Sequence, residues 1–241
     1  MPLPKISTPT YELELPSTGK KIKYRPFLVK EEKILILALE SENTKQITTS
    51  VKSILKECIS TRGVKIDNLP IFDIEYLFLN VRGKSVSEAL DLIVTCPDDG
   101  KTTVPVKVYI DEIEVVKDPK HSNDIKLDDK LTLRLKYPSL DEFIKNNFDF
   151  SSRDEGVLDQ SFEIIASCID QVYNEDESWA ASDCTKKELL EWVETLNTNQ
   201  FKLIEEFFST MPKLSHTFKV TNPNTKVEND VTLEGLASFF A

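Results

Sequence analysis

The sequence holds 241 residues with a formal net charge of −11, and 40% of the residues are hydrophobic. This length and a mean hydropathy of −0.28 indicate a soluble globular protein with a substantial core, formed as one large domain or two small ones. The longest apolar run, residues 34–39, is far too short to span a bilayer, so we expect no membrane insertion. The N-terminus shows no cationic region followed by an apolar stretch, which indicates no secretory signal.

Charge is unevenly distributed along the chain. Residues 1–86 hold 14 Lys and Arg against 10 Asp and Glu, whereas residues 87–241 hold 16 against 31. An acidic C-terminal part argues against nucleic acid as a partner, because phosphate contacts need cations. The four cysteines are widely scattered, which favours reduced intracellular thiols over a disulfide framework; they are at positions 58, 96, 168 and 184.

The first predicted element is a β-hairpin over residues 11–25. Apolar residues alternate with glutamates on its first strand, and Ile22 and Tyr24 alternate with cations on its second. Gly19 lies in a turn tetrad and is free to take a positive φ. Pro26 cannot donate to a strand ladder, so the hairpin ends there.

Three helices are predicted after the hairpin, over residues 29–41, 44–61 and 70–81. The first has no polar stripe across residues 34–39, so we expect it to be buried on most sides. The second carries apolar residues at helical spacing. The third begins at Pro70, a residue favoured at helix starts.

The pattern then changes to β-structure. Strands are predicted over residues 90–95, 103–110 and 131–137, with a strong Asp-Asp-Gly-Lys turn between the first two. The polar residues 117–129 predict an exposed loop. The remainder is mostly helical, and a terminal hairpin is predicted at residues 215–220 and 230–233. The predicted helices of this part cover residues 140–146, 158–173, 186–196 and 199–210.

Two adjacent phenylalanine pairs occur in the C-terminal part, Phe207 with Phe208 and Phe239 with Phe240. Neighbouring side chains on a helix point about 100° apart. We therefore expect one member of each pair to face outward or towards a partner. The terminal pair is a candidate partner-binding site, because terminal helices often dock onto other surfaces.

Residues 94–101 and 220–226 echo each other in sequence, and each is followed by a second strand. Cys96 begins what resembles half a zinc knuckle, but Asp99 stands where a second thiolate is needed, and Asn222 replaces the cysteine in the second copy. We therefore predict a turn stabilised by Asp and Gly, with no metal and no cofactor. The echo also favours pairing between the β-rich middle and the terminal hairpin.

No catalytic site is predicted. The two histidines are His121 in a polar loop and His216 at a strand edge, and a lone surface histidine is usually solvated. The sequence has no Gly-x-Ser-x-Gly motif, and its six glycines form no phosphate-binding loop. These observations argue against an enzyme. A remote alternative is an enzyme whose site is assembled from scattered acidic residues and His216.

The opening block resembles the T4-type bacteriophage baseplate protein family, which includes hub assembly proteins of contractile-tailed phages. Its residues are Pro-Leu-Pro-Lys-Ile at 2–6, Leu-Pro-Ser-Thr-Gly at 15–19 and Tyr-Arg-Pro-Phe-Leu-Val-Lys-Glu-Glu-Lys at 24–33, followed by Ala-Leu-Glu-Ser at 38–41. The ending is similar to that of the family, with Leu-Ser-His-Thr-Phe at 214–218 and Leu-Glu-Gly-Leu-Ala-Ser-Phe-Phe at 233–240. Some family members carry Cys-rich knuckles at these hairpins, from which this chain departs at Asp99 and Asn222.

The resemblance implies a viral protein made in the host bacterial cytoplasm that helps to assemble the central hub of the tail baseplate. Its implied role is a chaperone-like factor that binds hub or tape-measure proteins, and the alternative is a permanent structural subunit of the virion baseplate. The candidate partner-binding residues are Arg25, Pro26 and Phe27 in the opening block and Phe239 and Phe240 at the end. The oligomeric state cannot be read from the sequence.

The predicted fold class is α+β. An N-terminal β-hairpin packs on a helical bundle, a β-rich middle follows, and a helical C-terminal part is closed by a hairpin. Changes in composition and charge divide the chain into residues 1–86, 87–137 and 138–241.

Overall fold

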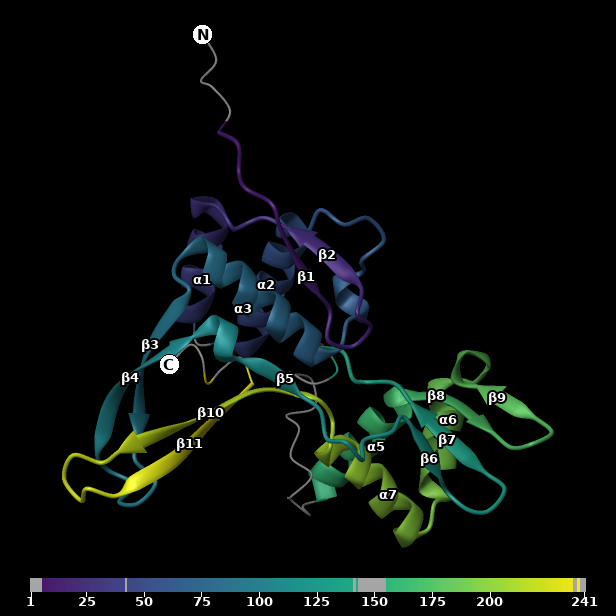
Figure 1. Cartoon of the computed structure of the whole chain (residues 1–241). Helices are drawn as coiled ribbons and strands as arrows, with labels where there is room; N and C mark the ends of the chain where they lie inside the picture. Colours follow the sequence, from purple (N-terminus) through teal and green to yellow (C-terminus); the bar gives the residue numbers. More distant parts are fainter. Residues whose placement is uncertain (1–5, 42, 141, 143–154, 236–237, 239–241) are drawn as a thin grey trace. The chain divides into compact units, whose positions relative to one another are not determined.

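The computed structural model describes residues 6–41, 43–140, 142, 155–235 and 238. It has α+β architecture, as predicted, and divides into two compact units (Figure 1). Unit 1 comprises residues 1–116 and 213–241, and unit 2 comprises residues 117–212. The division at residues 86 and 137 stays a prediction from composition. No helix in the described ranges combines the length and the apolar character needed to cross a bilayer.

The hairpin predicted at the start of unit 1 is confirmed. β1 (Tyr11–Glu14) pairs antiparallel with β2 (Lys21–Tyr24), and Gly19 takes a φ of +67° in the turn. The Ser17 amide donates to the carboxylate of Asp73 at 3.0 Å, and the Ser17 hydroxyl bonds the same carboxylate. This contact fixes the hairpin turn against the helices, because Asp73 is fully buried.

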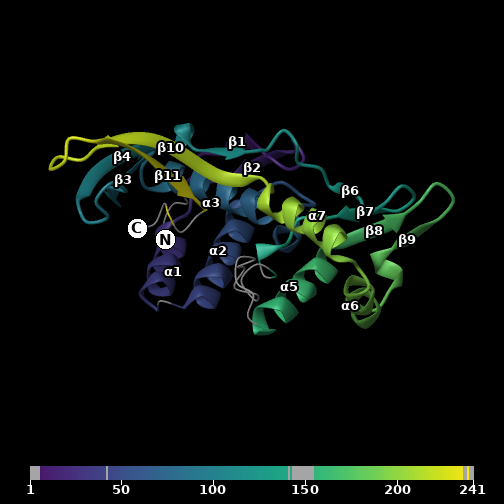
Figure 2. The ribbon, with the colours of Figure 1, turned by 90° about the horizontal axis from the view of Figure 1, so that it is seen from below.

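The three helices that follow are also confirmed: α1 (Val29–Glu40), α2 (Thr44–Cys58) and α3 (Ile71–Ser85). α2 contacts both α1 and α3, and the three helices lie together in unit 1 (Figures 1 and 2). A single β-bridge joins Tyr24 at the end of β2 to Ile59 after α2, so the hairpin is held at the end of α2.

The rest of unit 1 combines β-strands from the middle of the chain with the two strands near its C-terminus. β3 (Ala89–Thr95) pairs with β4 (Thr103–Tyr109), and β10 (Lys213–Thr221) pairs with β11 (Glu228–Glu234). The short β5 (Glu114–Val116) pairs with β10, which confirms that the β-rich middle associates with the terminal hairpin. One core joins α3 to these strands; its buried members are Leu79, Leu90, Leu92, Val108, Ile110, Ile113 and Leu214.

Unit 2 is a four-stranded antiparallel sheet packed with helices. The strand order is β6 (Asp124–Lys126), β7 (Thr132–Leu135), β8 (Ile169–Tyr173) and β9 (Ser178–Ala180). The helices are α5 (Glu155–Cys168), α6 (Lys186–Glu194) and α7 (Thr198–Ser209). α6 begins at Thr185 with a capping box formed with Glu188.

Two predicted boundaries in unit 2 are wrong. The helix expected over residues 158–173 ends at Cys168, and the chain continues as β8, because Ile169, Val172 and Tyr173 pair with β7. The loop expected over residues 117–129 contains β6, whose apolar Ile125 alternates with two exposed charged residues. The helix predicted over residues 140–146 lies mostly outside the described residues.

The two phenylalanine pairs have different outcomes. Phe207 and Phe208 on α7 are both buried, so the expectation that one of them faces outward is wrong. Phe207 packs against an aromatic cluster and Phe208 joins the unit 2 core, so α7 is covered on more than one side. Phe239 and Phe240 lie outside the described residues.

Candidate interaction surfaces and the clasp

The segment between β2 and α1 is bonded to its own unit. The Arg25 guanidinium donates to the carbonyl of Pro26 at 2.9 Å and to the carboxylate of Glu31 at 3.1 Å. Phe27 is buried, and its amide donates to the Ser85 hydroxyl at the end of α3 at 2.9 Å. These contacts tie the hairpin to the helices, and the role of this segment in partner binding stays a prediction.

Glu31 carries the buried negative charge of this segment. Burial alone would raise the pKa of its carboxyl, but hydrogen bonds from Arg25, the Leu28 amide and Lys30 outweigh burial and lower the pKa. The Leu28 amide donates to Glu31 at 2.6 Å, which satisfies one of the free amides at the start of α1. The ionised carboxylate therefore stabilises both Arg25 and the helix start.

α1 exposes apolar side chains, so the expectation that it is buried on most sides is wrong. The buried residues of α1 are Glu31, Leu35 and Ala38, which lie on one side of the helix. α2 lies beside α1 (Figure 2), and the side chains on the opposite side of α1 are exposed. The exposed apolar side chains of the α1 region are Leu28, Val29, Ile34, Ile36, Leu37 and Leu39.

Two turns of unit 1 share one backbone pattern, and we call residues 96–102 and 222–227 together the clasp. In the first turn the Gly100 amide donates to the Cys96 carbonyl, and in the second the Lys226 amide donates to the Asn222 carbonyl. Gly100 and Lys226 both have a φ of +63°. The sequence echo therefore corresponds to a real repeat of turn geometry.

The side chain of Asn222 connects the two turns of the clasp. Its amide nitrogen donates to the carboxylate oxygens of Asp98 at 3.0 and 3.2 Å and to a carboxylate oxygen of Asp99 at 3.0 Å. Its carbonyl oxygen accepts from the amides of Asn224 and Thr225 in its own turn. Asn222 is fully buried, so these contacts hold the β3–β4 hairpin against the β10–β11 hairpin.

Hydrogen bonds strongly favour the ionised form of Asp99. The hydroxyl and amide of Thr102 and the amide of Lys101 all donate to its carboxylate, and together with Asn222 they hold its pKa well below the usual range. Burial raises the pKa of the Cys96 thiol, and Asp98 and Asp99 raise it further. A zinc knuckle needs several thiolate or imidazole ligands. The clasp instead offers one thiol and carboxylates that already accept hydrogen bonds from amides and hydroxyls, so it does not fit a zinc knuckle. Within the described ranges, no three His, Cys, Asp or Glu side chains are grouped closely enough to hold a metal ion.

His121 is half-buried in unit 2 rather than solvated. Its ring stacks on Tyr137 with centroids 5.6 Å apart and lies 4.9 Å from the ring of Phe207. Its nitrogens lie 2.9 Å from the Thr210 hydroxyl and 3.1 Å from the Tyr137 hydroxyl. Burial lowers the pKa of His121, and the carboxylate of Asp118 opposes that effect only in part.

The second histidine, His216, belongs to unit 1. Its Nδ1 lies 3.0 Å from the carbonyl of Glu112, and its Nε2 lies 3.9 Å from the carboxylate of the same residue. Its ring stacks on Phe218. His216 thus contacts the chain segment that precedes β5.

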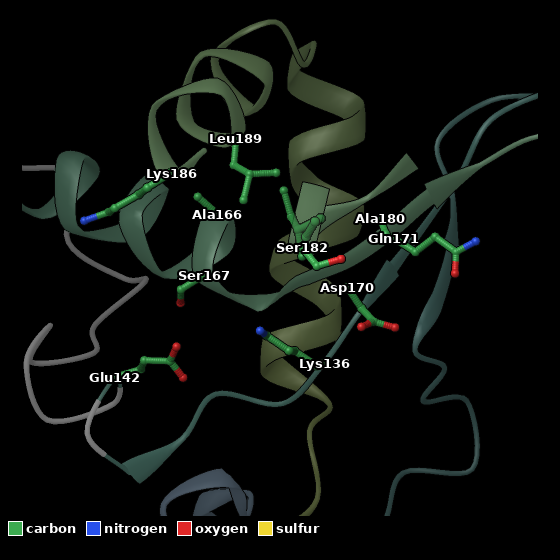
Figure 3. Close-up of a pocket in the computed structure, with 12 residues that line it drawn as sticks. Lys136, Glu142, Ala166, Ser167, Asp170, Gln171, Ala180, Ser182, Lys186 and Leu189 are labelled. Carbon is green, nitrogen blue, oxygen red and sulfur yellow. The ribbon is translucent and has the colours of Figure 1, made fainter. Parts of the chain in front are cut away.

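A cleft of about 490 Å³ lies in unit 2 (Figure 3). Lys136 follows β7, Asp170 is on β8, Lys186 is on α6, and Ser167 is near the end of α5. Lys186 forms an ion pair with Glu163 at 3.1 Å, so one of the two cleft lysines already has an acidic partner. The cleft thus presents charges of both signs, which gives it no strong preference for an anionic or a cationic ligand.

Sequence reasoning missed two features of these surfaces. It identified the echo at Cys96 and Asn222 but not the bonds that Asn222 makes to the opposite turn, since distant turns become neighbours only in the fold. It also missed the exposure of Ile36 and Leu37, because an apolar run has the same pattern whether its own chain or another molecule covers it.

Comparison with known proteins identifies a family. A family model described as T4 bacteriophage base plate protein matches residues 8–241. No curated protein and no solved structure matches the chain.

Proposed function

This chain belongs to the T4 bacteriophage base plate protein family, and from that premise we propose that it is a chaperone-like factor in assembly of the tail baseplate hub. Its partners would be hub or tape-measure proteins of the same phage. The family match supports a role in the baseplate, and it covers nearly the whole chain and so includes both compact units. The site of action would be the host bacterial cytoplasm during assembly.

The surface of unit 1 supports a binding role. An assembly factor must offer apolar surface to other proteins and stay soluble while doing so. α1 provides exposed apolar side chains, and the net charge of −11 favours solubility through mutual repulsion between molecules. Both properties suit a protein that binds assembly partners.

We propose that this binding involves no catalysis. The cleft of unit 2 is the natural place to look for a reaction, and its charged groups include Lys136, Asp170 and Lys186. A Lys136→Ala variant should therefore support hub assembly as well as the wild type does. A specific loss of assembly in a folded Lys136→Ala variant would contradict this part of the proposal and favour the enzyme alternative.

A permanent structural subunit of the virion baseplate is the second candidate, because the family match supports it equally. The two roles share the expectation that the protein binds other baseplate proteins. They differ in whether that binding persists in the mature particle.

Co-expression and affinity capture test the proposal. The tagged chain is produced together with each hub and tape-measure protein of the phage that encodes it, and complexes are identified by mass spectrometry. We expect stable or transient capture of at least one of them, with crosslinking to retain transient complexes. An unrelated tagged protein of similar size and acidic charge is the control, and failure to capture any of these proteins would refute the proposal.

A further inference from the structure

The outward side of α1 has a definite pattern of apolar and charged residues. At 100° per residue, Val29, Lys33, Ile36, Leu37 and Glu40 lie opposite the buried side of the helix. All five are exposed, and the three apolar ones are 80%, 49% and 56% exposed in chain order. A helix that is apolar on nearly all sides is normally covered, so this strip indicates a contact that one molecule alone does not complete.

Two charges flank the apolar pair at the middle of the strip. Lys33 lies three residues before Ile36, and Glu40 lies three residues after Leu37. Neither Lys33 nor Glu40 makes an ion pair with any residue that the structure describes. By contrast, the neighbouring Lys30 pairs with Glu31 at 3.1 Å. The two charges are therefore available to another molecule.

This order is self-complementary when two copies of α1 meet antiparallel. With a twofold axis between Ile36 and Leu37, each Ile36 opposes Leu37 of the second copy, and each Lys33 opposes Glu40 of the second copy. The symmetry makes every such contact occur twice. A parallel arrangement would instead place like charges opposite each other, and its helix dipoles would repel.

We propose that α1 pairs antiparallel with α1 of a second copy of this chain, and that this pairing covers the exposed strip. The twelve residues of α1 extend about 18 Å at 1.5 Å per residue, so the contact is small compared with a standard protein interface of about 800 Å² per partner. The association is therefore weak and reversible. Leu28, the residue before α1, is also exposed and extends the apolar surface at the start of the helix.

Reversing the charges of Lys33 and Glu40 is the most direct test of this pairing. Sedimentation velocity over a range of concentrations of the purified full chain should show a monomer–dimer equilibrium. Lys33→Glu alone and Glu40→Lys alone each place like charges in opposition and should weaken the dimer about fivefold to thirtyfold, because each acts at two symmetric pairs. The double variant Lys33→Glu/Glu40→Lys restores opposite charges across the axis and should recover dimerisation to within about threefold.

Two further variants serve as controls. Leu37→Gln removes apolar contact at the axis and should weaken the dimer more than either charge reversal. Lys65→Glu changes the charge by the same amount at an exposed position of unit 1 outside α1 and should leave the dimer unchanged. Circular dichroism checks that each variant is folded.

The outcomes separate this proposal from the proposed function, because the purified chain is tested without other phage proteins. A monomer at all concentrations, or a double variant as weak as the single ones, would overturn the pairing of α1 with itself. If Leu37→Gln abolishes capture of a hub protein while the wild type is monomeric, the strip belongs to that partner instead, and the proposed function stands.

Discussion

Replacing Asn222 by alanine should open the clasp and destabilise unit 1. The two N–H groups of the buried side chain donate to carboxylates of Asp98 and Asp99, and hydrogen bonds to charged groups contribute about 1.5–3 kcal/mol each. Water can partly replace them because the turns lie at the surface. We therefore expect Asn222→Ala to lower the free energy of unfolding of unit 1 by about 2–4 kcal/mol.

The distribution of tryptophans helps the assay. Trp179 and Trp192 both lie in unit 2, so tryptophan fluorescence during urea unfolding reports that unit. Hydrogen exchange measured by mass spectrometry on peptides of β3–β4 and β10–β11 reports unit 1. Asn222→Ala should increase exchange in those hairpins and leave the fluorescence transition within about 0.5 kcal/mol of the wild type.

Two companion variants sharpen the test of the clasp. Asn222→Asp keeps the size of the side chain but places a third carboxylate beside Asp98 and Asp99, so it should be worse than alanine at neutral pH and improve as the pH falls towards 4. Asn224→Ala removes one exposed bond to Thr102 and should cost about 0.5–1 kcal/mol. If hairpin exchange in Asn222→Ala matches that of the wild type, the clasp does not hold the two hairpins together.

Four other predictions test single side chains of the two units. Arg25→Ala leaves the buried carboxylate of Glu31 without its guanidinium partner and should destabilise unit 1 by about 2–3 kcal/mol, as measured by hydrogen exchange. Unchanged stability would contradict this contact, and loss of hub capture in a variant that stays folded would identify the segment as a binding surface. Folding lowers the pKa of His121, so unit 2 should lose stability as the pH falls below about 6.5, and His121→Gln should remove that loss. Folding also lowers the pKa of Asp99, so protonation of this carboxyl should weaken the clasp only below about pH 4. Phe207→Ala should lower the free energy of unfolding of unit 2, followed by tryptophan fluorescence, by about 3–4 kcal/mol. Leu203→Ala, on the more exposed side of α7, should lower it by less than about 1 kcal/mol, and equal losses would refute the packing of α7.

Local patterns predicted the elements that depend on neighbouring residues. The hairpin around Gly19 follows from turn chemistry, which acts over a few residues. The end of α5 at Cys168 was missed because β8 is apolar enough to continue a helix, and only its partner strand β7 decides the outcome.

The candidate surfaces were less accessible to sequence reasoning. The clasp depends on residues more than 120 positions apart, such as Asp98 and Asn222 at a separation of 124, so spacing could suggest the repeat but not the bonds. Leu37 is exposed because no other described helix of unit 1 covers it, and no local pattern reports such an exposure. Family membership, in contrast, could be inferred from the sequence of the opening block and the ending, and the family match confirms it.

The most direct test of the proposed assembly role is a quantitative protein inventory of purified virions of the phage that encodes this chain. The proteins of the particles and of the infected-cell lysate are measured by mass spectrometry, with known baseplate subunits as internal standards for copy number. A chaperone-like factor predicts that the protein is abundant in the lysate and absent from the particles or far below the copy number of the hub subunits. Its presence in mature virions in a fixed ratio to those subunits would contradict the proposal and identify it as a structural component of the baseplate.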